Sequence, residues 1–97
     1  MSKFVIVGTI DAVPGQRDRV VATLKEHRTR CFRDEKGVVS FDIMTANDND
    51  TSIYVHEIYE DVAAFEAHFI GDSFKVWQKE TAGLVAGLNV HKSTLVE

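Results

Sequence analysis

Apolar and polar residues alternate with a period of two in four segments of the chain, and this period is typical of β-strands. The segments are residues 3–11, 38–46, 53–60 and 88–96. The first and third segments are apolar on both alternations, which indicates strands that are covered on both faces. The chain therefore contains four predicted strands, of which two are buried on both sides.

A helical period occupies residues 16–34, between the first two strands. Val20, Leu24, His27 and Cys31 follow one another at i, i+4, i+7 and i+11, so one face of the predicted helix is apolar and carries a histidine. Turn-forming and helix-ending residues bound this helix, namely Pro14, Gly15 and Gly37.

A second helical region lies between the third and fourth strands. Asp61 is a suitable N-cap for a short helix over residues 62–69, and Gly71 breaks that helix. A further helical stretch is predicted from residue 73 to about residue 85, immediately before the last strand.

The order β-α-β-β-α-β is that of the split βαβ arrangement of the ferredoxin-like fold. We predict an α+β protein in which residues 1–97 form a single domain, with an antiparallel sheet and its helices on one face. The strands are apolar on both sides, so the bare face of the sheet needs a cover. The sequence therefore predicts a homodimer through the open sheet face, which is a dimeric α+β barrel.

Composition narrows the possible partners and the cellular location. The net charge of −4 comes from scattered acids and bases, which argues against nucleic acid. No apolar run reaches the roughly 18 residues needed to cross a membrane, and the N-terminus does not resemble a signal peptide, so we expect a cytoplasmic protein. The single Cys31 and the four dispersed His residues predict neither a disulfide nor a metal site.

Three titratable residues are candidates for chemistry. His27 lies on the apolar stripe of the first helix, where it either contacts a carbonyl or carboxylate or lines a pocket as a base. Glu57 shares an apolar strand face, where it either accepts the proton of a phenol or pairs with a cation such as Arg28 or Lys75. His68 lies beside an apolar helix edge, either in the pocket or as a cap at the helix end.

Aromatic residues at helical spacing accompany these groups. Phe74 and Trp77 face the same way and form either core or one wall of a cavity for an aromatic substrate. We expect Cys31 to be a buried, unreactive thiol. The side chains predicted to contact a small apolar or aromatic molecule are Phe41, Tyr59, Phe65, Phe74 and Trp77.

The chain resembles the antibiotic biosynthesis monooxygenase family over nearly its whole length. FVIVGTIDAVPGQRDRV is similar to the family's first strand, Pro-Gly turn and first helix, and EKGVVSFDIM is similar to its acidic residue, Gly and following strand. The segment YVHEIYEDVAAFEAHFIGDSFKVW matches the family best, with its aromatic-x-x-Glu-x-aromatic run and its Ala-Phe-x-x-His helix. The members that it resembles include quinol monooxygenase-like and autoinducer-2 degradation protein-like proteins.

The resemblance implies a dimeric α+β barrel that oxidises an electron-rich aromatic, phenolic or quinol substrate with O₂ and needs no cofactor. It also implies that His68, Glu57 and His27 are the catalytic candidates. Haem-degrading relatives carry an Asn near the end of the first strand and a Trp and a His on the second helical region, where this chain has Gly8, His68 and Gln78, so haem is not expected.

Two other functions remain open at this point. One is an isomerase or other proton-transfer enzyme that acts on a small carbonyl compound, for which a phosphorylated substrate would require a basic cluster such as Arg28, Arg30 and Arg33. The other is a dimer that binds a small ligand without turning it over.

Overall fold

Four strands and three helices make up the part of the chain that the computed structural model describes, residues 2–97. In chain order they are β1 (Phe4–Ala12), α1 (Arg17–Asp34), β2 (Val38–Thr45), β3 (Ser52–Tyr59), α2 (Val62–Phe69), α3 (Asp72–Glu80) and β4 (Val85–Thr94). No helix in residues 2–97 is long and apolar enough to cross a membrane.

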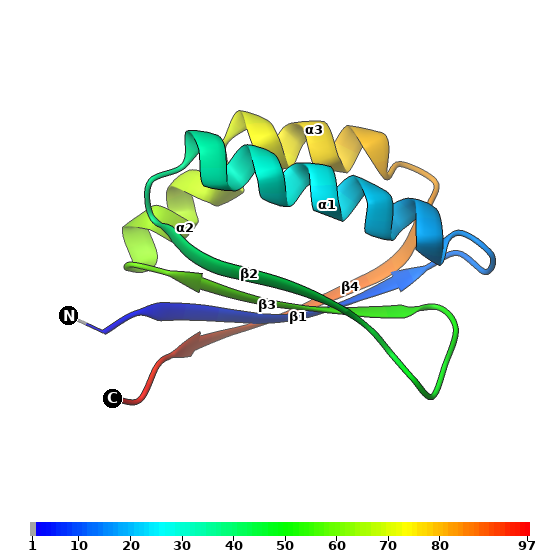
Figure 1. The fold of residues 1–97 in the computed structure, drawn as a ribbon, viewed down its shortest axis with the longest axis horizontal. Coiled ribbons are helices and arrows are strands. Elements are labelled where there is room, and N and C mark those ends of the chain that lie inside the picture. The colour runs from blue at the N-terminus through cyan, green and yellow to red at the C-terminus, as the bar shows by residue number, and fades with distance from the viewer. Residues whose placement is uncertain (1) are drawn as a thin grey trace.

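The strands form one antiparallel sheet in the order β2-β3-β1-β4, and all three helices lie on one side of it (Figure 1). β1 and β3, the two strands predicted to be apolar on both faces, occupy the centre of the sheet. The predicted ferredoxin-like α+β fold is confirmed, with the second helical region divided into α2 and α3 by the break at Gly71.

Two boundaries differ from the sequence prediction by more than two residues. α3 ends at Glu80 rather than near residue 85, because Gly83 has a φ of 80° and turns the chain into β4. β4 accordingly begins at Val85, three residues before the predicted strand start.

A bulge between Val38 and Ser40 alters the predicted alternation of β2. Val38 takes the position on the helix side, opposite Tyr59, whereas Val39 is 44% exposed. A bulge inserts one residue into one strand of an antiparallel pair, so a strictly alternating sequence cannot reveal where it lies.

The core lies between α1 and the sheet. The predicted stripe of α1 is buried throughout, at Val20, Leu24, His27 and Cys31. These residues pack toward buried residues of the sheet, which include Ile10, Phe41, Ile53 and Val55. Full burial of one large apolar side chain stabilises the fold by about 1.5–3 kcal/mol, so this stripe fixes α1 on the sheet.

Gly37 lets α2 approach the connection between α1 and β2. Its φ is not positive, so the residue is needed for space and not for a left-handed helix cap as the sequence suggested. A Cβ atom on Gly37 would overlap the Cβ atom of Ala64 in α2. Glu60 also donates its backbone N–H to the Gly37 carbonyl (2.9 Å), which holds the two segments together.

We expect Gly37→Ala to lower the free energy of unfolding by about 1–3 kcal/mol, the usual cost of overpacking. The double variant Gly37→Ala/Ala64→Gly removes the overlapping methyl group. It should recover part of the loss, although glycine inside α2 itself costs about 1 kcal/mol. Urea unfolding of the four proteins in this cycle measures the coupling, and strictly additive losses would contradict the close approach.

Candidate functional site

A cavity of about 210 Å³ lies between the helices and the sheet. Its lining is mostly apolar and aromatic and comes from every element of the fold, with residues Ile6, Ile10, Leu24, His27, Phe41, Val55, Glu57, Phe65, His68, Phe69, Phe74, Trp77, Leu88, Val90 and Lys92. An apolar pocket with a few convergent polar groups is the usual form of a small-molecule site.

The cavity is least covered along β4 and at the end of α2. Leu88, Val90 and Phe69 line it, yet they are 53%, 42% and 52% exposed. Lys92 follows on the same strand face, with its Nζ 5.7 Å from the centre of the Phe65 ring. The cavity therefore opens to solvent between β4 and α2.

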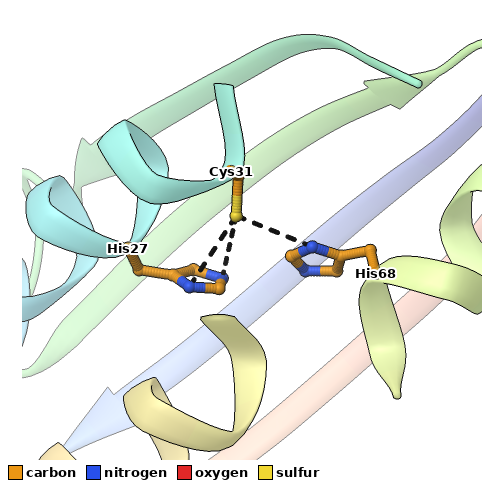
Figure 2. A group of neighbouring side chains, drawn as sticks. All are labelled: His27, Cys31 and His68. Atoms are coloured by element: carbon orange, nitrogen blue, oxygen red, sulfur yellow. Dashed lines mark hydrogen bonds between the residues drawn. The ribbon is translucent and has the colours of Figure 1, made fainter. Parts of the chain in front are cut away.

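Three buried side chains meet at one wall of the cavity (Figure 2). Cys31 and His27 lie one turn apart on α1, and His68 comes from α2. The Cys31 Sγ lies 3.6 Å from His27 Nε2, 3.8 Å from His27 Nδ1 and 3.6 Å from His68 Nδ1, so it faces both ring nitrogens of His27 and one of His68. Burial raises the pKa of the Cys31 thiol to about 12, so the thiol is protonated near neutral pH, as the sequence analysis expected of an unreactive cysteine.

His68 is held by a carboxylate. Its Nδ1 lies 2.7 Å from Glu35 Oε1, and its side chain is 5% exposed. When Nδ1 carries the proton and donates it to Glu35, Nε2 is left as the basic nitrogen. The Asp61 N-cap of α2, whose side chain accepts a hydrogen bond from Ala64 N, and the break at Gly71 set the helix that positions this ring.

Glu57 forms a second polar pair within the apolar lining. Tyr59 Oη donates a hydrogen bond to Glu57 Oε1 (2.5 Å), so the partner of Glu57 is neither Arg28 nor Lys75. Burial raises the pKa of Glu57, and the hydrogen bond from Tyr59 offsets only part of that rise. Burial and the neighbouring Glu57 also raise the pKa of Tyr59, which stays a phenol and a donor.

The cavity gathers most of the residues that the sequence singled out. His27, Glu57 and His68 line it, as do the predicted contact residues Phe41, Phe65, Phe74 and Trp77. Tyr59 does not line it: its side chain is fully buried behind Glu57, which it holds by a hydrogen bond. The alternation of β3 places both side chains on the same face but cannot tell which one reaches the cavity.

Sequence reasoning missed several residues of the site. Glu35 precedes the glycine of the EKGVV segment, and only the folded chain brings it to His68. Phe69 stacks on Phe65 with a ring distance of 5.9 Å, and its place just after His68 was the available signal. The contributions of Leu88, Val90 and Lys92 depend on β4 pairing with β1, which no local pattern encodes.

His27 should make the protein sensitive to acid. Burial, together with the nearby His68 and Arg30, lowers the pKa of His27 from 6.5 to about 4. Between these two pH values the folded state binds fewer protons than the unfolded state, so the free energy of unfolding falls as pH falls.

We expect wild type to lose on the order of 2–3 kcal/mol of stability through His27 between pH 7 and pH 4. His27→Gln should lack this loss. Chemical denaturation across that pH range measures both proteins, and taking their difference removes the opposite contribution of Glu57, which both retain. Parallel pH profiles would contradict a neutral, buried His27.

Comparisons with known proteins place the chain in a family. The sequence model of the antibiotic biosynthesis monooxygenase family matches residues 3–80 of this chain. Among solved structures, a protein of Chloroflexus aurantiacus that is provisionally named an antibiotic biosynthesis monooxygenase is 23% identical, with a TM-score of 0.87 over 99% of this chain and 95% of its own.

Two further structures with the same provisional name are also similar. The protein from Bacteroides thetaiotaomicron is 25% identical, with a TM-score of 0.87 over 98% of this chain and 90% of its own. The protein from Caulobacter crescentus is 18% identical, with a TM-score of 0.92 over 99% and 92%. No curated protein sequence matches the chain. Because the family model covers residues 3–80 of 97, the chain belongs to the antibiotic biosynthesis monooxygenase family.

Proposed function

We propose that the protein is a cofactor-independent monooxygenase that oxidises a small phenol, quinol or other electron-rich aromatic compound with O₂. The observation that carries this proposal is the His68–Glu35 pair at the wall of a cavity lined mainly by apolar and aromatic side chains. A base in such a site can remove one proton from an aromatic hydroxyl while the surrounding side chains exclude water.

The size of the cavity limits the substrate. Apolar cavities of about 150 Å³ hold benzene. The volume here is about 210 Å³, which suits a substituted single ring or two fused rings. Phe41, Phe65, Phe74 and Trp77 supply aromatic walls, and each favourable ring pair adds about 0.5–1.5 kcal/mol to binding.

His68 is the best candidate for the base. Its Nδ1 is engaged by Glu35, so an incoming hydroxyl meets Nε2, and the carboxylate stabilises the imidazolium that forms. His27 is a poor base, because burial lowers its pKa to about 4. We assign His27 to the cavity wall, where it contacts Phe41 and Trp77 at ring distances of 5.7 and 6.0 Å.

The proposed reaction balances with O₂ as the only co-substrate. The phenol gives its proton to His68, and the phenolate passes one electron to O₂. The two radicals then join at an electron-rich ring carbon. Loss of water leaves one oxygen atom on the ring as a carbonyl, so phenol and O₂ become quinone and water, and the substrate supplies all four electrons. The side chains position the ring and handle protons.

Glu57 is proposed to donate a proton or a hydrogen bond, whereas His68 accepts a proton. Burial raises its pKa, so the carboxyl group holds a proton more readily than an exposed glutamate does. In the protonated form it can donate to a developing oxyanion, while Tyr59 fixes its orientation.

The available cations do not favour the isomerase that acts on a phosphorylated compound. Arg33 pairs with Asp34 at 2.8 Å, and Arg30 approaches Glu80 at 3.5 Å. Arg28 approaches the Phe41 carbonyl at 3.5 Å. Among the described cavity residues, Lys92 is the one cation, which is too few for a phosphate group.

We also propose that the protein works as a homodimer through the open sheet face. Val7, Met44 and Tyr54 are 44%, 42% and 39% exposed on the side away from the helices. The Asp42 and His56 side chains lie 3.8 Å apart on the same face. A two-fold interface buries the same patch of both subunits and has an apolar core, so these exposed apolar side chains suit a self-complementary surface.

Oxygen uptake by the metal-stripped protein, with a panel of hydroquinones, phenols and naphthols, tests the proposed reaction. We expect uptake above the uncatalysed rate. His68→Ala should slow it by about 10²–10⁴-fold, the usual contribution of a general base. Glu57→Gln should slow it less, because glutamine keeps a donor at this position.

The exposed Gln78 and Glu66 provide controls outside the cavity, and Gln78→Ala and Glu66→Gln should leave uptake unchanged. A lack of uptake with every compound would overturn the oxygenase. Ligand binding that survives all substitutions, without turnover, would instead support the binding protein.

Sedimentation of the purified protein tests the dimer. We expect Tyr54→Asp to weaken dimerisation by at least about a hundredfold, because a buried, unpaired carboxylate costs several kcal/mol. Val76 on α3 is 42% exposed, and Val76→Asp should leave the dimer intact. A wild-type monomer, or equal effects of the two substitutions, would contradict this interface.

A further inference from the structure

The cluster of His27, Cys31 and His68 has the composition of a metal site. One sulfur and two imidazoles converge from α1 and α2, and their ligand atoms all lie within 4.8 Å of one another (Figure 2). All three side chains are buried, at 3%, 0% and 4% exposure. His27 and Cys31 are at positions i and i+4 of α1, so their side chains lie next to each other on the helix and can bind the same ion.

The two distances from the sulfur of the cluster to imidazole nitrogens agree with tetrahedral coordination. Zn²⁺ binds sulfur at about 2.3 Å and imidazole nitrogen at about 2.0–2.1 Å, which places neighbouring S and N ligands about 3.5 Å apart. The Cys31 Sγ lies 3.6 Å from His27 Nε2 and 3.6 Å from His68 Nδ1. The cluster therefore needs little rearrangement around the sulfur to hold such an ion.

We propose that His27, Cys31 and His68 bind one Zn²⁺ ion, with the Glu35 carboxylate as the fourth ligand. Glu35 Oε1 lies 2.7 Å from His68 Nδ1 and outside the group of three converging ligand atoms, so it becomes a ligand when its side chain turns toward the ion. A thiolate and a carboxylate balance the two positive charges of Zn²⁺. The occupied site is thus electrically neutral, as a buried site requires.

The donor set selects the class of ion. A thiolate with two imidazoles favours Zn²⁺ and other thiophilic ions over Mg²⁺ and Ca²⁺, which prefer oxygen ligands. Binding releases the thiol proton of Cys31, because a coordinated thiol loses its proton to the positive charge of the ion.

A bound ion would also regulate the proposed oxygenase, and this part of the inference rests on that proposed function. The ion ties up Glu35 and fixes His68, so the ring can no longer accept a proton from substrate. We therefore expect Zn²⁺ to inhibit oxygen uptake and a chelator to restore it. The zinc site and the oxygenase activity can be tested independently. Metal binding is measured without substrate, and oxygen uptake is measured without metal.

Titration of the reduced, metal-stripped protein with Co²⁺ tests the site directly. We expect one Co²⁺ per chain, with thiolate-to-metal charge-transfer absorption and the intense visible bands of tetrahedral coordination, both lost on addition of Zn²⁺. Mg²⁺ should leave the spectrum unchanged. Cys31→Ala should abolish the charge-transfer band, and His27→Gln and His68→Gln should each weaken binding by at least about tenfold.

The two histidines on the open sheet face, which is the side of the sheet away from the cluster, offer controls. His91→Gln and His56→Gln, of which the second removes the exposed His56–Asp42 pair, should bind Co²⁺ like wild type. X-ray absorption of Zn²⁺-loaded wild type needs no variant and should report one sulfur ligand at about 2.3 Å. The absence of stoichiometric binding, a site without sulfur, or binding that disappears with His56 or His91 would overturn the proposal.

Discussion

The hydrogen bond between His68 and Glu35 joins the two helical regions at the wall of the cavity, and the proposed chemistry depends on it. Its length of 2.7 Å and the burial of His68 fix the imidazole in one orientation. Glu35 can reach His68 because Gly37, two residues later, lets the connection after α1 lie against Ala64 of α2. A small residue in a connecting segment thereby determines where the candidate base stands.

Burial lowers the pKa of the buried base and raises the pKa of the buried acids, and both shifts favour the uncharged form of the group. It lowers the pKa of His27 and raises those of Glu57 and Cys31, because low polarity disfavours every charged form. These three groups therefore tend toward neutrality, in keeping with the mainly apolar and aromatic lining of the cavity. Such a cavity favours an uncharged aromatic molecule, and it also explains why a thiophilic cation would need both Cys31 and Glu35 as anions.

The sequence predicted the layers of the fold better than its local irregularities. The apolar stripe of α1 and the central strands β1 and β3, which are apolar on both faces, could be predicted from periodicity. A face that is buried along its whole length requires apolar residues at a regular spacing. The bulge at Val39 and the early start of β4 depend on pairing between distant segments, which periodicity does not contain. For the same reason His27, Glu57 and His68 could be proposed as site residues, whereas Glu35 and the inward position of Tyr59 could not.

An anaerobic crystal structure with 1,4-dihydroxynaphthalene tests the central claim most directly, because the absence of O₂ preserves the bound quinol. The account predicts the ring between the helices and the sheet, against Phe74 and Trp77, with one hydroxyl within about 2.6–3.2 Å of His68 Nε2. A quinol bound elsewhere, or one whose hydroxyls contact neither His68 nor Glu57, would contradict it.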